Sequence, residues 1–375
     1  MNTGLTGRKH QGQTNFKHGR MPRLAIVLIN LGTPDAPTTS AVRRYLAQFL
    51  SDTRVVEIPK FIWKLILHGI ILRTRPAKSA RAYARVWGDE GSPLMVLTNQ
   101  LRDKLAVELE QRIPGPVQIA VAMRYGNPAI RDVLEKLHLE GAERFLILPL
   151  YPQYSGATTG TVADEVFASL SRLRWVPELR MMGAYHDDPG YILALADSIR
   201  AHWQEKGRGD KLLISFHGMP KATLDAGDPY FCHCHKTARL VAEELALEEG
   251  QWEMAFQSRF GYADWLQPYV VQRLAALPTE GVRHLDMICP AFAVDCLETL
   301  DEIAVEGRDS FLESGGERFE YIPALNASPA QVAMLADRIL NHAAGWPEMS
   351  AEFDAEKLQQ QLNISQQLAQ SKGGR

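Results

Sequence analysis

The sequence has few cysteines. Its 375 residues contain four, which are Cys232, Cys234, Cys289 and Cys296. Secreted disulfide-rich domains carry paired cysteine frameworks in much shorter chains, so this composition excludes that class and favours a reducing compartment. We therefore expect a cytoplasmic protein.

Long apolar runs are also missing. The first 22 residues are polar and basic and contain no apolar stretch of signal-peptide length. The longest candidate for membrane contact is 61–72, which is too short to span a bilayer and is interrupted by Lys64 and His68. We expect this segment to lie on a surface or to cap a pocket, with at most peripheral contact to the inner face of a membrane.

A strong charge excess is absent as well. The net charge is -3, and no basic stripe is interleaved with aromatic residues, which argues against a nucleic-acid partner. The sequence contains no G-x-G-x-x-G motif. The segment Gly156–Gly160 could hold an anion at a helix start, but it lacks the Lys-Ser/Thr ending of a phosphate loop. A nucleotide-dependent enzyme is therefore a weak alternative.

The chain does contain a regular alternation of apolar strands and helices. With 46% hydrophobic residues it can bury a large core. The run Leu24–Leu31 has strand length and is closed by Gly32, which is typical of a buried parallel strand. Similar runs alternate with helical patterns, so we predict doubly wound α/β sheets. The other expected strands are Val117–Met123, Arg144–Leu150, Lys211–Phe216 and His284–Cys289, with helices at Ala129–Leu137 and Thr237–Leu247.

Two short similarities indicate that the second half repeats the first. LGTP at 31–34 matches HGMP at 217–220, and 141–149 resembles 281–290. We therefore expect two similar Rossmann-like lobes, each a parallel sheet flanked by helices. The expected organisation is a flexible tail at 1–22, an N-terminal lobe at 23–175, a C-terminal lobe at 176–345 and a polar, Gln-rich tail at 346–375.

Two residues of the second half suit a transient metal site. His217 directly follows the strand 211–216, so its imidazole should project into the crevice beyond the strand ends, unless it is only hydrogen-bonded within its loop. Imidazole accepts protons near neutral pH and binds borderline-soft metals. Together with Glu298, it would form a mixed nitrogen and oxygen site for a divalent first-row metal that must bind and then leave.

The segment 295–306 is acidic. Glu298, Glu302 and Glu306 are spaced four residues apart, which would place three carboxylates on one face of an α-helix. Such a row is consistent with a solvated face, and Asp295 and Glu298 could equally cap the start of the helix. A path for metal ions or protons is the functional alternative.

Aromatic and polar residues follow two strands of the first half. Arg124 and Tyr125 follow the strand 117–123, and YPQYSGATTG at 151–160 follows the strand 144–150. These loops offer aromatic faces and hydrogen-bonding groups, which suits a flat apolar ligand with charged substituents.

CHCH at 232–235 is a weak metal signature because no second pair of similar spacing accompanies it. We expect free thiols in a polar loop, and an iron–sulfur or zinc site stays open as the alternative.

Five motifs in order resemble the ferrochelatase family and spread over about residues 23–345. They are LINLGTP at 28–34, LPLYPQYS at 148–155 with TTG at 158–160, SFHGMP at 215–220, FQSR at 256–259 and DCLETL at 295–300.

The resemblance implies a class II chelatase fold with the active site in the cleft between the lobes. The implied activity is that of a protohaem ferro-lyase, which inserts Fe2+ into protoporphyrin IX in the final step of haem biosynthesis and releases two protons. His217 and Glu298 would bind iron and take part in catalysis, and Asp295, Glu302 and Glu306 would form a path for protons or metal. The residues expected to line the porphyrin pocket are Leu31, Arg124, Tyr125, Tyr154 and Ser155, with 61–72 as an apolar lip.

The resemblance also sets expectations for cofactors and partners. Fe2+ is a substrate, and no cofactor is required. Animal members hold a [2Fe–2S] cluster through cysteines of a C-terminal extension, whereas the tail after Met349 has none, so we do not predict that cluster. Cys296 stands where many members have a second histidine, which leaves the role of that position open. A chelatase for cobalt or nickel and a porphyrin carrier without catalysis remain alternatives, and the expected state is a monomer or homodimer.

Overall fold

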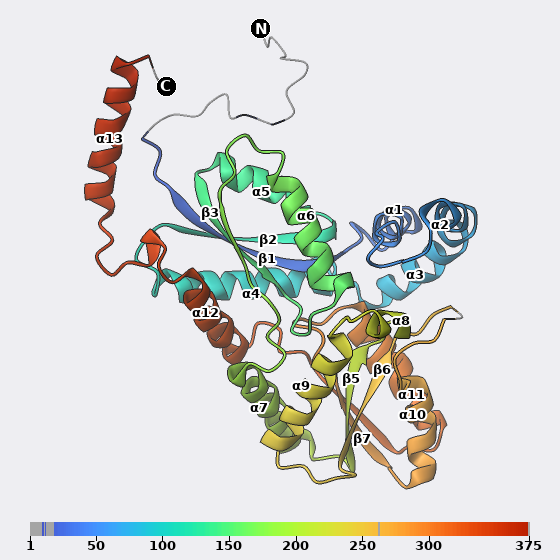
Figure 1. Ribbon diagram of the computed structural model, residues 1–375. Helices are drawn as coiled ribbons and strands as arrows, with labels where there is room; N and C mark the ends of the chain where they lie inside the picture. The colour runs from blue at the N-terminus through green and yellow to red at the C-terminus, as the bar shows by residue number, and fades with distance from the viewer. Residues whose placement is uncertain (1–9, 11, 13–18, 262, 374–375) are drawn as a thin grey trace.

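Two four-stranded parallel sheets form the framework of the molecule (Figure 1). The computed structural model describes residues 10, 12, 19–261 and 263–373. The strand orders are β2-β1-β3-β4 and β6-β5-β7-β8, so each lobe repeats the same topology. The predicted fold class of two similar α/β lobes is confirmed. The strands are β1 (Arg23–Thr33), β2 (Val117–Gly126), β3 (Ala142–Pro149), β4 (Glu178–Met181), β5 (Lys211–His217), β6 (Trp252–Gln257), β7 (His284–Ile288) and β8 (Arg318–Ile322).

Helices cover the sheets and connect their parallel strands, as a parallel sheet requires. The segments η1, η2 and η4 are π-helical, and η3 and η5 are short 3-10 helices. The elements are α1 (Thr39–Leu50), α2 (Lys60–Ile66), η1 (Leu67–Ile71), α3 (Leu72–Val86), α4 (Pro93–Glu110), α5 (Ile130–Leu139), η2 (Gly156–Gly160), α6 (Thr161–Leu170), α7 (Pro189–Lys206), α8 (Lys221–Asp225), α9 (Tyr230–Glu244), α10 (Val270–Ala276), η3 (Leu277–Glu280), η4 (Glu298–Gly307), α11 (Arg308–Glu313), α12 (Pro329–Ala343), η5 (Pro347–Met349) and α13 (Ala355–Ser371).

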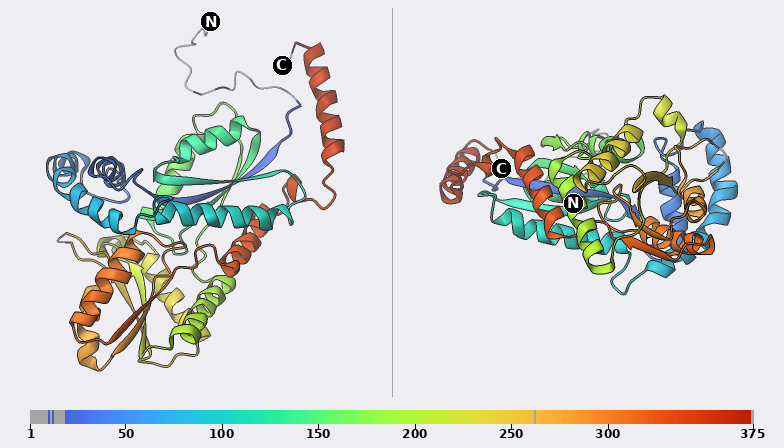
Figure 2. Two further views of the ribbon diagram at one scale, coloured as in Figure 1. Left: turned by 180° about the vertical axis from the view of Figure 1, so that it is seen from behind. Right: turned by 90° about the horizontal axis from the view of Figure 1, so that it is seen from below.

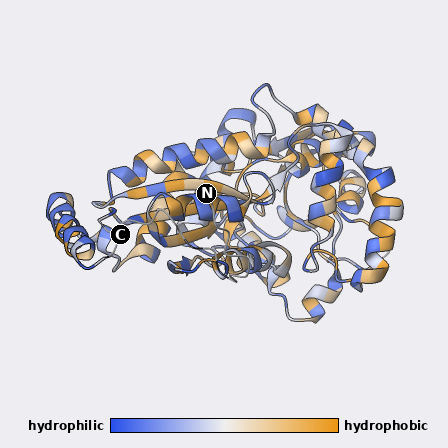
Figure 3. Cartoon of the chain, turned by 90° about the horizontal axis from the view of Figure 1, so that it is seen from above, coloured by the Kyte–Doolittle hydropathy of each residue, from blue (hydrophilic) through white to orange (hydrophobic). Residues whose placement is uncertain are grey.

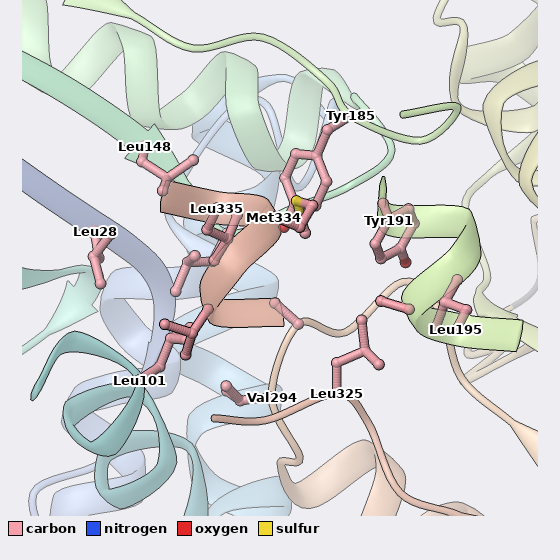
Figure 4. Close-up of a cluster of buried hydrophobic side chains, with 14 of the residues drawn as sticks. Leu28, Leu101, Leu148, Tyr185, Tyr191, Leu195, Val294, Leu325, Met334 and Leu335 are labelled. Atoms are coloured by element: carbon pink, nitrogen blue, oxygen red, sulfur yellow. The ribbon is translucent and has the colours of Figure 1, made fainter. Parts of the chain in front are cut away.

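One apolar core joins the lobes. Leu28 and Leu148 of the first sheet pack with Leu335 of α12, and the same cluster continues through Tyr191 of α7 into the second lobe (Figure 4). All four side chains are at most 1% exposed. Burying an aliphatic side chain of this size stabilises the fold by about 2 kcal/mol, so this shared core holds the lobes in a defined relative position.

The central strands of both lobes end at a glycine that the packing requires. A Cβ on Gly32, after the buried part of β1, would lie 1.7 Å from the Tyr125 carbonyl oxygen, and its φ is +113°. A Cβ on Gly218, directly after β5, would lie 2.6 Å from the Gln257 carbonyl oxygen. The two short similarities in the sequence therefore fall on corresponding strands, β1 with β5 and β3 with β7.

Several segments differ from the expectation. The strand β4 pairs with β3, so the first sheet continues beyond the boundary expected at residue 175. Helix α9 begins at Tyr230 rather than near Thr237, which places CHCH inside a helix and not in a loop; that prediction was wrong. The polar segment 346–375, for which a frayed helix or a tail is expected, contains the helix α13. Most of the tail expected at 1–22 lies outside the described residues.

The helices after β1 project to one side of the first sheet, above the strand ends of the second lobe, whereas α13 stands apart from the body (Figure 2). Apolar residues dominate the central strands and alternate with polar ones along the surrounding helices (Figure 3). Across the described residues, no helix combines the length and apolarity needed to cross a membrane.

Candidate active site

His217 is the last residue of β5, at the carboxyl end of the second sheet. Its side chain is partly buried, and its Nδ1 lies 2.7 Å from the Gly218 carbonyl oxygen. Because a carbonyl only accepts hydrogen bonds, Nδ1 must carry the proton in this contact. The Nε2 atom of the neutral ring then keeps a lone pair, which can accept a proton or bind a metal ion.

Glu298 opens the π-helical segment η4 and is linked to β5 through Gln257. Gln257 pairs with His217 across the sheet, and its amide Nε2 donates to the Glu298 carbonyl oxygen at 3.3 Å. The Glu298 side chain is partly buried and lies within electrostatic reach of Tyr45 and Tyr83 of the first lobe, since its charge adds to burial in raising the pKa of both phenols. The first residue of η4 thus lies between the two lobes.

Glu302 lies close enough to both predicted iron ligands, His217 and Glu298, for their charges to affect its pKa. Burial raises the pKa of its carboxyl, hydrogen bonds from Ser258 and the charge of His217 oppose that rise, and the charge of Glu298 adds to it. Ser258 donates from its backbone nitrogen at 2.7 Å and from its hydroxyl at 2.6 Å. Glu302 therefore lies within electrostatic reach of both His217 and Glu298.

The other acidic residues have protein partners. Glu306 is exposed and forms an ion pair with Arg85 at 3.0 Å. Asp295 is 4% exposed and accepts hydrogen bonds from Tyr321 at 2.6 Å and from Asn326 at 2.7 Å. The segment is π-helical, so the expected α-helical face is wrong. No side chain caps its start, which removes the alternative that Asp295 and Glu298 cap the helix.

Arg124 and Tyr125 belong to a polar network in the first lobe. Asp52, which follows α1, accepts from Arg124 Nη2 at 2.6 Å, from the Tyr125 hydroxyl at 2.8 Å and from Thr161. Burial alone would raise the pKa of Asp52, but the hydrogen bonds from Thr161 and the Arg54 backbone outweigh it and lower that pKa. Tyr125 is fully buried. The guanidinium and the phenol are thus directed at Asp52.

Ser155 and the glycine segment after it are held by an acidic residue of the other lobe. Ser155 caps η2 and is fully buried. Asp228 accepts from the Ser155 hydroxyl at 3.1 Å and from the Gly156 backbone nitrogen at 2.7 Å. The anion position predicted at 156–160 is therefore filled by a carboxylate of the chain itself.

Of the remaining predicted lining residues, Tyr154 contacts the other lobe. Leu31 and Tyr154 are partly buried, and the Tyr154 backbone nitrogen donates to His233 Nδ1 at 3.2 Å. The expected lip is strongly exposed: Phe61 is 73% and Leu65 is 74% accessible. Apolar side chains so exposed typically mark a binding surface.

The CHCH segment does not converge on one point. Cys232 is exposed, Cys234 is buried in the main core, and His233 stacks on His186 with ring centroids 3.6 Å apart. Successive helical residues point about 100° apart, which explains this divergence. In the part of the chain that the structure describes, no three His, Cys, Asp or Glu side chains are arranged to hold a metal ion.

The sequence did not point to three residues that bind the predicted site residues or the segments that carry them: Asp52, Arg85 and Asp228. The pair Asp228-Pro229 ahead of an amphipathic pattern is a helix-start signal that could have located α9 and its cap. Asp52 and Arg85 have no local signal, because their partners are far away in the sequence.

Solved structures with the same fold include two bacterial chelatases. SirB from Bacillus subtilis with Fe3+ superposes with a TM-score of 0.51 at 11% identity, covering 86% of this chain and 96% of that one. The sirohydrochlorin chelatase SirB from B. subtilis subspecies spizizenii, in complex with cobalt, gives 0.50 at 10% identity, covering 88% and 100%. At such identities the likeness concerns the fold alone.

Sequence comparison is more specific. The ferrochelatase family model matches residues 23–343. The ferrochelatase of Thioalkalivibrio sulfidiphilus is 50% identical over 367 residues, which are 98% of this chain and 100% of the relative. That of a Polaromonas species is 53% identical over 350 residues, covering 92% and 95%. Matches of this length and identity include both lobes and every motif, and the chain therefore belongs to the ferrochelatase family.

Proposed function

We propose that this member of the ferrochelatase family inserts Fe2+ into protoporphyrin IX with His217 and Glu298 as the groups that hold the iron. The products are protohaem and two protons, and the reaction is the last step of haem biosynthesis. The observation that carries this proposal is that Glu302 lies within electrostatic reach of both His217, at the carboxyl end of β5, and Glu298.

The chemistry needs a proton acceptor and a weak cation site close together. Metal insertion replaces two pyrrole N–H bonds by bonds from the nitrogens to iron, so two protons leave as one Fe2+ enters. The His217 Nε2 lone pair binds the incoming ion together with the hard carboxylate oxygen of Glu298, which releases the ion readily. Once the ion has passed to the porphyrin, Nε2 accepts one of the two pyrrole protons and the Glu302 carboxylate accepts the other. A site complementary to a distorted macrocycle would stabilise the transition state rather than the substrate.

Glu302 is the best placed of the three path residues proposed beside the iron site. Its buried carboxyl has a raised pKa, which brings it closer to the pH at which it can exchange protons. Glu306 continues the path toward solvent, in contact with Arg85. Asp295 has a supporting role in this proposal: the hydrogen bonds that it accepts from Tyr321 and Asn326 hold the turn that leads into η4.

The first lobe supplies the walls of the porphyrin pocket in this proposal. Leu31 and Tyr154 offer contact area to the macrocycle because both are only partly buried. Arg124, Tyr125 and Ser155 support that wall from behind, since their polar atoms already bind Asp52 and Asp228.

The lip formed by α2 and η1 carries a further proposal, peripheral contact with an anionic membrane surface. Phe61 and Leu65 are exposed beside Lys60 and Lys64, and Glu57 is the one acidic residue between 53 and 86. Apolar side chains flanked by cations bind the boundary between lipid headgroups and acyl chains.

Substitution of His217 by alanine tests the iron site. We expect turnover to fall by about a hundredfold or more, while porphyrin binding followed by fluorescence stays measurable. The assay is anaerobic incubation with Fe2+ and protoporphyrin, observed through the Soret and visible bands. His284→Ala, at the opposite end of the second sheet, is the matched control and should keep its activity. Near-normal turnover of His217→Ala would refute the assignment.

A further inference from the structure

Arg85 links the first lobe to the helix that carries Glu298. It lies near the end of α3, and its Nε and Nη2 atoms donate to the two carboxylate oxygens of Asp301 at 2.6 and 2.5 Å. Nη2 also donates to Glu306 at 3.0 Å. A planar guanidinium bound at two oxygens fixes an orientation as well as a distance, which a lysine cannot do.

The environment of Asp301 makes this contact more than a surface ion pair. Asp301 is 4% exposed and lies three residues after Glu298 in η4. The Arg85 side chain is 49% exposed, so the loss of this cation costs less than in a fully buried pair, but it still leaves a nearly buried carboxylate without its ion-pair partner. Any movement of η4 away from α3 would therefore have to break both hydrogen bonds of the Arg85 fork.

The start of η4 contacts α3 as well. Leu297, directly before Glu298, packs on the cluster of Val42, Ala80 and Tyr83. The charge of Glu298 adds to burial in raising the pKa of Tyr83, so the carboxylate lies near this phenol. One helix of the first lobe thus makes an apolar contact directly before η4 and an ion pair with the first turn of η4.

We infer that Arg85 is a positioning residue for iron insertion: by binding Asp301 it fixes the rotation of η4 and so directs Glu298 toward His217. π-Helical segments are rare and concentrate at functional sites. Arg85 touches neither substrate in this scheme. The inference rests on the proposed role of Glu298 in binding iron.

The test is a steady-state comparison of Arg85→Ala, Arg85→Lys and Asp301→Asn in the full-length enzyme. For Arg85→Ala we expect the KM for Fe2+ to rise about tenfold while the KM for protoporphyrin changes less than about twofold. Asp301→Asn should behave similarly, and Arg85→Lys should fall between it and the parent because it keeps the charge but loses the fork.

Arg112→Ala is the matched control, because it removes another ion pair, with Asp337 at 2.6 Å, that involves neither α3 nor η4. It should leave both KM values unchanged. Parallel rises of both KM values in Arg85→Ala, or an unchanged KM for Fe2+, would overturn the inference. Glu298→Gln distinguishes failure of the iron site from failure of the positioning role. If Glu298→Gln inserts iron normally, the proposed iron site is wrong. If Glu298→Gln is inactive while Arg85→Ala has normal KM values, only the positioning role of Arg85 is rejected.

Discussion

The two lobes share one topology but use the ends of their strands differently. Both sheets have the same strand order, and both central strands end beside a glycine that contacts the neighbouring strand. In the first lobe the polar residues at this edge, Arg124 and Tyr125, bind Asp52. In the second lobe His217 keeps an Nε2 lone pair directed away from its carbonyl contact.

The connections after the central strands differ as well. After β1 the chain forms the helices α1 to α4 before returning to the sheet, whereas after β5 it forms the short α8 and then α9. The long connection supplies both the exposed lip and Arg85. The two lobes share a fold but have different proposed roles, the porphyrin wall in the first and the iron site in the second. These roles depend on the side chains at the strand ends rather than on the sheets.

The largest effect expected from this difference is on stability and concerns Asp52. Asp52→Ala leaves Arg124 without its buried carboxylate, so we expect the free energy of unfolding to fall by about 3 kcal/mol. Turnover per folded molecule should decrease far less than in His217→Ala. Denaturant unfolding and the anaerobic assay at low temperature measure the two quantities.

Asp35→Ala is the control for that experiment, because Asp35 pairs with Arg44 on the surface at 3.4 Å. Exposed pairs contribute between 0 and about 1 kcal/mol. If Asp52→Ala abolished turnover without loss of stability, the first lobe would carry chemistry too and the contrast between the lobes would be wrong.

The lip predicts a smaller difference between the lobes. Phe61→Ser with Leu65→Ser should weaken cosedimentation with vesicles containing anionic lipid by about tenfold, since two apolar side chains no longer enter the bilayer boundary. Val271→Ser, which changes a strongly exposed apolar residue of α10 in the second lobe, should have no effect. Equal binding of all variants would remove the membrane proposal.

The smallest expected effect is a pH dependence at the interlobe boundary, where His186 stacks on His233. Burial, followed by the nearby charge of His233, lowers the pKa of His186 from 6.5 to about 4. The unfolded chain therefore binds a proton at higher pH than the folded one, and stability should decline as the pH falls from 6.5 toward 4. After allowance for solvent screening, His186→Gln should remove on the order of 1 kcal/mol of this decline in unfolding curves. His284→Gln should not change it, and an unaltered pH profile for His186→Gln would contradict the expectation.

Particular elements explain why some predictions from the sequence failed. The pattern around 232–235 was interpreted as a loop, but Cys234 is one of the apolar positions of an amphipathic helix that starts at Tyr230. The acidic row was assigned to an α-helix because its spacing cannot distinguish an α-helix from a π-helix. The glycine segment 156–160 does present a backbone N–H to an anion, but the partner is Asp228 from the other half of the chain.

The sequence alone determined the alternation of strands and helices, the repeat of the two lobes and the family, because these depend on apolar periodicity and on motifs that are local. It also identified His217 and Glu298 as the candidates for iron. Only the tertiary structure decided which polar groups are already bound to partners in the chain, such as Arg124 by Asp52 and Asp301 by Arg85. Those contacts join residues far apart in the chain, and packing of the shared core brings them together.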